Sequence, residues 1–133
     1  MAHILVVEDN PTNLKLVCDL LECEGHDVLA AVDAEEALEK IREFRADLIL
    51  MDLGLPGMDG LSLTRILKAG ETTKRIPVVA LTAFAMKGDS VKAFEAGCDG
   101  YITKPIDTRR LPRQLAEFLQ PAESQGPGEG NLL

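Results

Sequence analysis

A short apolar run that ends in a carboxylate, at residues 48–56, constrains the fold of this chain more than any other stretch. Four large apolar residues, at 48–51, lead directly into Asp52, and Gly54 and Pro56 follow within four positions. An apolar run of this length between turn-forming residues is typical of a strand that is buried on both faces. The pattern therefore predicts a parallel strand with Asp52 at its carboxyl end, where ligands bind in open α/β sheets.

Four more apolar segments of the same kind occur along the chain, and a helical pattern follows each strand. The expected strands cover 4–7, 28–32, 47–52, 76–82 and 99–103, and the expected helices cover 11–24, 34–44, 61–68, 83–96 and 108–119. This alternation forces parallel strands joined by right-handed crossovers, with helices on both faces of the sheet. The sequence thus predicts an α/β fold, a flavodoxin-like (βα)5 doubly wound five-stranded parallel sheet with strand order 2-1-3-4-5.

Two of the expected helices begin with capping signals. Asn10 precedes Pro11, a residue suited to the first helical position, so Asn10 is expected to cap the first helix. Asp33 is the expected cap of the second helix, and Glu36 three residues later gives a pattern like that of a capping box.

Size, charge and cysteine content narrow the class of protein. Residues 1–120 are expected to form one domain, and residues 121–133, which lack periodicity, a disordered tail. A net charge of −8 argues against binding to nucleic acid or anionic membranes. No apolar run reaches the roughly 20 residues that a membrane span requires. Cys18, Cys23 and Cys98 lack metal-ligand spacing and are expected to be packed, reduced thiols of a cytoplasmic protein.

Polar residues end four of the five expected strands, and all of them reach the same edge of the sheet. They are Glu8 with Asp9, Asp52, Thr82 and Lys104. Three adjacent carboxylates raise the pKa of at least one of them unless a cation joins them, and hard oxygen ligands suit Mg²⁺. A hydroxyl and an ammonium can pair with phosphate oxygens. Each residue alone would be a helix cap or a solvated side chain, but together they favour phosphoryl transfer onto Asp52.

The motifs that contain these residues resemble those of a response-regulator receiver domain of two-component signalling. Within that family the chain is similar to single-domain regulators of the DivK type and to the receivers of hybrid kinases. The resemblance covers residues 3 to 120 in order and spacing, and its motifs lie at 5–10, 50–56, 80–89 and 101–106.

The resemblance implies a role for each acidic residue. Asp52 would accept a phosphoryl group from a phosphohistidine on an upstream histidine kinase or histidine phosphotransfer domain. Asp9 and Asp52 would bind Mg²⁺ directly, Glu8 would support the ion through water, and the backbone carbonyl of Gly54 would be a further ligand. Many family members carry a larger or polar side chain at the position of Gly54, so access of water to the phosphoaspartate, and hence its lifetime, would differ here.

The resemblance also implies a switch. Thr82 and Lys104 would hold the phosphoryl oxygens together with the N–H of Ala83, and Tyr101 would turn inward when Thr82 moves toward the phosphate. The surface formed by the fourth helix, the fifth strand and the fifth helix would then change and control a downstream protein target. The expected function is that of a stand-alone bacterial response regulator, a monomer or weak dimer without an output domain.

Two other classes of function fit the sequence less well. A constitutive binding module of receiver fold would be expected to have a degenerate site, whereas this site is complete. An aspartyl phosphatase usually has a second acid two residues after the nucleophile, where Gly54 stands. The chain has no glycine-rich loop with Lys-Ser/Thr for nucleotide hydrolysis, and its first loop is acidic rather than the hydroxyl-rich loop of a flavin site. We therefore expect a phosphoacceptor that catalyses only its own phosphorylation and dephosphorylation.

Overall fold

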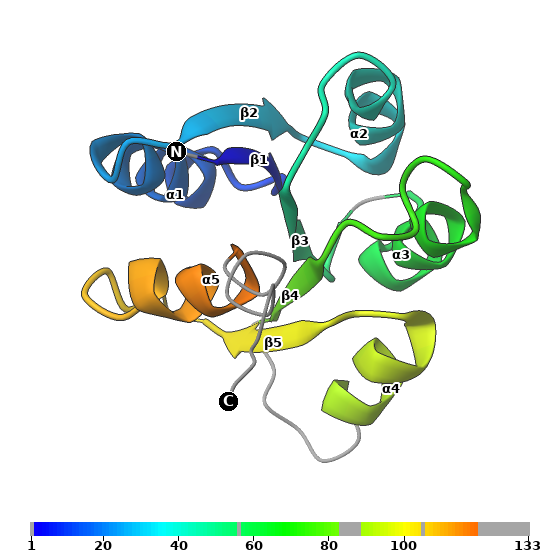
Figure 1. The fold of residues 1–133 in the computed structure, drawn as a ribbon. Helices are drawn as coiled ribbons and strands as arrows, with labels where there is room; N and C mark the ends of the chain where they lie inside the picture. The colour runs from blue at the N-terminus through cyan, green and yellow to red at the C-terminus, as the bar shows by residue number, and fades with distance from the viewer. Residues whose placement is uncertain (1, 56, 83–88, 105, 120–133) are drawn as a thin grey trace, which may run out of the picture.

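The computed structural model describes residues 2–55, 57–82, 89–104 and 106–119, and these form a three-layer α/β sandwich (Figure 1). A parallel sheet in the order β2-β1-β3-β4-β5 is its central layer. The strands are β1 (His3–Val7), β2 (Asp27–Ala31), β3 (Leu48–Asp52), β4 (Val78–Thr82) and β5 (Gly100–Thr103). The predicted fold class and strand order are confirmed.

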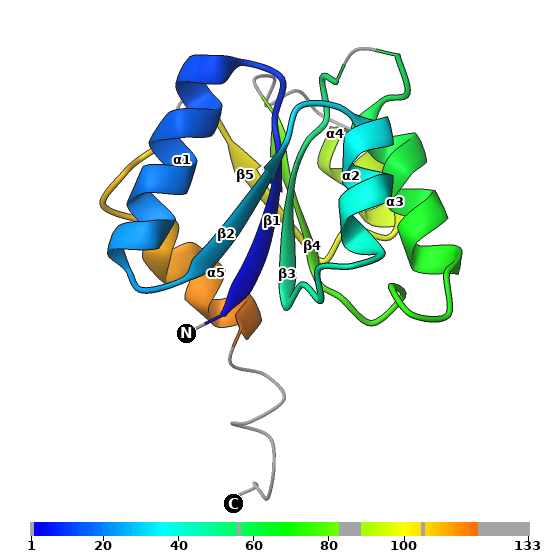
Figure 2. The ribbon, with the colours of Figure 1, turned by 90° about the horizontal axis from the view of Figure 1, so that it is seen from above.

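Helices cover both faces of this sheet. Figure 2 shows α1 and α5 on one side and α2, α3 and α4 on the other. The helices are α1 (Pro11–Cys23), α2 (Ala34–Ile41), α3 (Gly60–Ala69), α4 (Asp89–Ala96) and α5 (Leu111–Leu119). None of the described helices has both the length and the apolar character needed to cross a membrane.

The central strands are apolar throughout because each face of the sheet has its own core. β3 and β4 are buried at every position. Alternate residues serve alternate cores: Leu50 packs with α1 and α5, whereas Ile49 and Met51 pack with α2, α3 and α4. A polar side chain within these strands would enter one of the two cores, so polar groups collect at the strand ends.

Capping residues set the helix starts largely as predicted. The side chain of Asn10 accepts hydrogen bonds from the backbone N–H groups of Thr12 and Asn13 at 3.0 Å each. Asp33 Oδ1 accepts from the N–H of Glu36 at 2.8 Å. The carboxylate of Glu36 reaches back to the N–H of Val32 rather than to that of Asp33, so the predicted capping box is shifted by one residue.

Several predicted boundaries differ from the observed ones for local reasons. The second helix ends at Ile41 rather than at residue 44, because the chain turns there and Phe44 packs against the core. The last helix begins at Leu111, since Asp107 organises a preceding turn by accepting hydrogen bonds from the backbone N–H groups of Arg109 and Arg110. The predicted start of the fourth helix, the Lys104–Pro105 peptide and the predicted tail lie outside the described residues.

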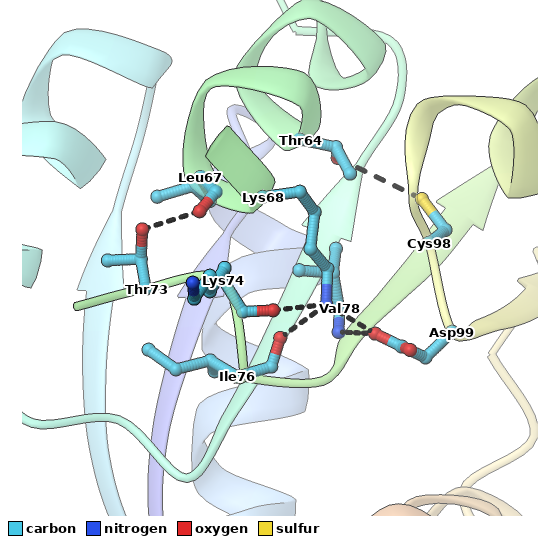
Figure 3. Close-up of polar contacts among 9 residues, drawn as sticks. All are labelled: Thr64, Leu67, Lys68, Thr73, Lys74, Ile76, Val78, Cys98 and Asp99. Atoms are coloured by element: carbon cyan, nitrogen blue, oxygen red, sulfur yellow. Dashed lines mark hydrogen bonds and ion pairs between the residues drawn. The ribbon is translucent and has the colours of Figure 1, made fainter. Parts of the chain in front are cut away.

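The three cysteines are free thiols in different environments. Cys98 is buried, and its Sγ lies 3.8 Å from Thr64 Oγ1 (Figure 3). Cys18 is half-buried and Cys23 is exposed, so the prediction that all three are packed is wrong for Cys23. Position 23 is the last residue of α1 and lies on the side of the helix away from its buried residues, Val17 and Leu21.

A polar cluster around Lys68 joins α3 to the loops before β4 and β5 (Figure 3). Lys68 Nζ donates to the Ile76 carbonyl and to Asp99 Oδ2 at 2.8 Å each, and Asp99 Oδ2 also accepts from the N–H of Val78 at 2.9 Å. One ammonium and one carboxylate thus satisfy backbone groups at the amino end of β4, at the opposite edge of the sheet from Asp52.

Replacing Lys68 with methionine is expected to lower the free energy of unfolding by about 1–2 kcal/mol, because the Ile76 carbonyl and Asp99 both lose a charged donor. Urea unfolding of Lys68→Met, Asp99→Asn and the double variant measures the coupling between the two residues. We expect a coupling of about 1 kcal/mol.

The exposed Lys15–Asp19 pair of α1 provides the control for this cycle. It has the same chemistry, but its side chains are 78% and 57% exposed. Its coupling should be smaller than that of the Lys68–Asp99 pair, because solvent screens exposed charges. Equal couplings in the two cycles would contradict a structural role for the Lys68 cluster.

Candidate functional site

The carboxyl ends of β1 and β3 meet at the point where the order of the sheet reverses. β1 pairs with both β2 and β3, and Val7 is in register with Met51. Glu8 and Asp9, which follow β1, therefore lie beside Asp52, the last residue of β3. One carboxylate oxygen from each of the three residues lies within 4.8 Å of the other two. The predicted meeting of three carboxylates at this edge is observed.

Glu8 is the most deeply buried of the three acids, with no exposed surface. Its Oε2 accepts a hydrogen bond from the backbone N–H of Asn10 at 3.2 Å. Its Oε1 lies 2.8 Å from the ammonium of Lys104, yet within the described part of the chain it receives no well-aligned hydrogen bond. This carboxylate is held in place, but one of its oxygens retains the capacity to accept.

Asp52 is 4% exposed and is held from both sides. Its Oδ1 accepts from the backbone N–H of Gly54 at 3.0 Å, and its Oδ2 lies 3.4 Å from Lys104 Nζ. Lys104 therefore contacts Glu8 and Asp52 together. Its own backbone is fixed because its N–H donates to the Thr82 carbonyl at 2.7 Å.

Thr82 ends β4, next to the strand that carries Asp52. Leu81 is in register with Asp52, so Thr82 lies one residue beyond that pair, and its side chain is buried. Thr82 is also in register with Thr103, the residue before Lys104. Register thus brings the predicted hydroxyl and the predicted ammonium to the same edge as the acids.

Burial and the neighbouring charged groups both shift the pKa values in this cluster. Burial and the neighbouring Asp52 raise the pKa of Glu8 to about 7. Burial alone would raise the pKa of Asp52, but hydrogen bonds with Glu8 and the Gly54 N–H, together with Lys104, hold that pKa below its usual range. Burial alone would lower the pKa of Lys104, but Glu8 and Asp52 raise it. At neutral pH Asp52 is thus an anion and Lys104 a cation, while Glu8 is poised to lose or hold a proton.

The donor set of the cluster fits a hard divalent cation. The three carboxylates lie together, only Glu8 and Asp52 contact the Lys104 ammonium, and Glu8 Oε1 is a buried oxygen without a well-aligned donor in the described residues. Oxygen donors with this excess of negative charge suit Mg²⁺ or Ca²⁺ better than softer metals. Asp9 is exposed, so the cluster is open to solvent on one side.

Of the remaining predicted site residues, the structure describes Gly54 and Tyr101. Gly54 is exposed next to the acids, and a Cβ built there would lie 3.7 Å from Asp52 Oδ1, an ordinary contact. Tyr101 is half-buried in β5. It lines a cavity of about 500 Å³ together with Ile106, Arg110 and Gln114. Ala83 lies outside the described residues.

Two features of the site are absent from the sequence-based prediction. The backbone N–H groups of Asn10 and Gly54 orient Glu8 and Asp52, although Asn10 was predicted only as a cap and Gly54 only as a carbonyl ligand. Lys104 contacts Glu8 more closely than Asp52, whereas the sequence suggested only a phosphate partner for it. No residue pattern signals a backbone donor or the choice between two acids, since both depend on tertiary geometry.

Comparison with known proteins gives a consistent result. Residues 4–116 match the family model of the response regulator receiver domain. The chain is 44% identical over 116 residues to the polar-differentiation response regulator DivK of Brucella anthropi. This match covers 87% of this chain and 94% of that protein.

Solved structures give the same fold. The receiver domain of the sensor histidine kinase PA1611 from Pseudomonas aeruginosa, solved with a magnesium ion coordinated in its active site cleft, has 38% identity and a TM-score of 0.82. The match covers 89% of this chain and 97% of that one. The chemotaxis response regulator CheY4 of Vibrio cholerae has 28% identity and a TM-score of 0.85, over 90% of this chain and 99% of that one. A five-stranded fold of this order, an acidic cluster at its switch point and a match over residues 4–116 establish that the chain belongs to the response regulator receiver domain family of two-component signalling.

Proposed function

We propose that the chain is a phosphorylation switch in which Asp52 accepts a phosphoryl group from a phosphohistidine on a histidine kinase or a histidine phosphotransfer domain. The observation that carries this proposal is the cluster of three carboxylates with the Lys104 ammonium at one edge of the sheet. Each of these groups alone has a common structural use. Their combination beside the Thr82 hydroxyl provides the groups that phosphoryl transfer requires.

In the proposed transfer an Asp52 carboxylate oxygen attacks phosphorus. The new oxygen–phosphorus bond forms as the bond between phosphorus and the donor imidazole nitrogen breaks, and that nitrogen keeps the electron pair. Asp52 suits the role of nucleophile because its lowered pKa keeps it ionised at neutral pH. The Gly54 N–H binds Oδ1, which leaves Oδ2 and Lys104 on the other side of the carboxylate.

The acidic residues would hold a Mg²⁺ ion during this transfer. Asp9, Asp52 and the Gly54 carbonyl would bind it directly, and Glu8 would support it through water. When bound, the ion would offset the negative charge of the transferring group. Lys104 would exchange its contact with Glu8 for one with a phosphoryl oxygen, since a dianionic phosphoryl group attracts the ammonium more strongly than a single carboxylate does.

The added charge would then bias a second conformation of the domain. Thr82 and the N–H of Ala83 would donate to phosphoryl oxygens, and Tyr101 would turn inward beside Thr82. The surface of α4, β5 and α5 would change with them and bind a protein target. The 44% identity to the DivK regulators supports a function exerted through partner proteins. Residues 1–120 would act as the domain, with 121–133 as a tail.

Replacing Asp52 with asparagine should abolish modification by a small phosphodonor. The intact mass of the wild-type chain in Mg²⁺ and acetyl phosphate should rise by one phosphoryl group, and that of Asp52→Asn should not, because an amide is not a nucleophile here. Asp33→Asn is the matched control, since Asp33 caps α2 after the edge strand β2 and asparagine caps a helix equally well. An unmodified wild type, even with a phosphorylated histidine kinase as donor, would instead favour a constitutive binding module.

The raised pKa of Glu8 predicts how stability depends on pH in the absence of metal. With a pKa of about 7 in the folded chain against 4.5 in the unfolded chain, Glu8 keeps its proton over a range in which the unfolded chain has lost it. The resulting stabilisation is complete below pH 4.5 and is lost as the pH rises to 7. The contribution of Glu8 to the free energy of unfolding in EDTA should therefore fall from pH 5 to 7, by at most about 1.4 kcal/mol per pH unit.

Comparison with Glu8→Gln isolates this effect. The lowered pKa of Asp52 affects stability below pH 4, and the raised pKa of Lys104 affects it above pH 10. Both effects lie outside this range. The glutamine variant should have a flatter profile between pH 5 and 7. Saturating Mg²⁺ should also flatten the wild-type profile, because the ion binds carboxylates as anions. Parallel profiles for the two proteins in EDTA would contradict a shifted Glu8.

A further inference from the structure

The backbone contact between the start of α3 and the end of β3 is unusually close. A Cβ built on Gly60 would lie 2.5 Å from the carbonyl oxygen of Asp52 and 2.9 Å from Leu53 Cα. Both of these are backbone atoms, so a change of rotamer cannot relieve the overlap. Gly60 is buried and has a helical conformation, so backbone freedom is not the reason for glycine at this position. The reason is the space that α3 leaves for the residue carrying the phosphoacceptor carboxylate.

Neither side of this contact is free to move away. At the start of α3, Asp59 Oδ1 accepts from the N–H of Ser62 at 2.7 Å, and Thr64 Oγ1 donates to the Gly60 carbonyl at 2.7 Å. Leu63 and Leu67 fix the same helix in the core. A methyl group at residue 60 would therefore displace the two segments against these restraints.

The end of β3 is held equally firmly. The N–H of Leu53 donates to the Leu81 carbonyl at 2.9 Å, and Asp52 is in register with Leu81. Relieving the overlap requires a displacement of at least about 0.5 Å, since nonbonded carbon and oxygen atoms do not approach within 3 Å without strong repulsion. Part of that displacement would fall on Asp52, whose carboxylate depends on the Gly54 N–H and on Lys104.

We infer that Gly60 is a positioning residue for Asp52: the absence of a side chain at the start of α3 sets where the phosphoacceptor carboxylate lies relative to Glu8, Asp9 and Lys104. This inference rests on the proposed function of Asp52 and adds to it a residue that touches neither phosphate nor metal. The two glycines between Asp52 and Gly60 lack this role. Gly54 has room for a Cβ, and Gly57 has a positive φ of 70° with nothing within 4 Å of a built Cβ.

The alternative is that Gly60 serves only the packing of the fold, and Gly100 provides the matched control. Gly100 is also buried, and a Cβ there would overlap the ring of Phe118 between β5 and α5. Gly60→Ala and Gly100→Ala should therefore both lower stability in urea unfolding. Rates are compared in the full-length chain, under conditions where each variant is folded, with sucrose added where needed.

With acetyl phosphate and Mg²⁺, the initial rate of Asp52 modification should fall by about tenfold in Gly60→Ala, because a displacement of about 1 Å at a reacting group lowers a rate about 100-fold and the displacement here is about half as large. Gly100→Ala should stay within about twofold of wild type, since stability rather than geometry changes there. A folded Gly60→Ala with the wild-type rate would overturn the inference. So would an equal loss of rate in Gly100→Ala.

Mg²⁺ affinity, measured by NMR titration without a phosphodonor, is the second readout. Gly60→Ala should bind the ion several-fold more weakly than wild type, and Gly100→Ala equally well. This readout decides the inference even where the wild-type chain gives no phosphoryl adduct, a result that would contradict the proposed function alone. An unchanged Mg²⁺ affinity in Gly60→Ala would overturn the positioning role.

Asp59→Ala keeps the inference testable where Gly60→Ala does not fold. This variant removes the hydrogen bond to Ser62 that fixes the first turn of α3, without introducing any overlap. A loosened contact should reduce the rate and the Mg²⁺ affinity by about two- to fivefold. If Asp59→Ala matches wild type in both measurements, the start of α3 does not position Asp52 and the inference is overturned.

Discussion

The Lys104 ammonium, shared between the buried carboxylates of Glu8 and Asp52, is the interaction on which the site depends. Two carboxylates this close, one fully buried and one 4% exposed, would repel strongly in a poorly solvated environment. The ammonium offsets one of the two charges, and the raised pKa of Glu8 provides a way to remove the other. The negative charge of the cluster is therefore only partly compensated. The cluster retains an excess of negative charge near neutral pH, and a divalent cation can offset that charge.

The parallel sheet explains why these groups meet. β3 and β4 are buried at every position, so the first place where either strand can carry a polar side chain that reaches solvent is its carboxyl end. Reversal of the strand order between β1 and β3 then brings Glu8 and Asp9 beside Asp52. Two helix starts complete the arrangement. The N–H of Asn10, just before α1, donates a hydrogen bond to the Glu8 carboxylate. The backbone of Gly60, at the start of α3, packs closely against the backbone of Asp52.

The two ends of the sheet differ in chemistry. At the amino end of β4, Lys68 and Asp99 form an ion pair whose remaining hydrogen bonds go to backbone groups, and this pair joins elements of the fold. At the carboxyl end, Lys104 contacts two acids, and one of them keeps an oxygen without a well-aligned donor among the described residues. A satisfied pair stabilises one structure, whereas a partly satisfied cluster can exchange partners. The second property is the one that a switch requires.

Most of the fold could be predicted from the sequence because its signals are local. Short apolar runs and alternating helical patterns specify the order of elements, and the residues after each strand specify which side chains share an edge. The boundaries were less predictable, because the end of α2 depends on Phe44 packing and the start of α5 on the Asp107 turn. The contact of Lys104 with Glu8 and the space at Gly60 had no sequence signal, since each is a distance between segments far apart in the chain.

We expect a phosphoryl group on Asp52 to take Lys104 away from Glu8. A crystal structure of the chain with Mg²⁺ and beryllofluoride, a stable mimic of a phosphoryl group, tests this directly. We expect beryllium bonded to an Asp52 oxygen, the ion among the three carboxylates, and Lys104 Nζ on a fluoride rather than on Glu8 Oε1. Beryllofluoride bound elsewhere, or bound at Asp52 while Lys104 still joins Glu8 to Asp52, would contradict this expectation.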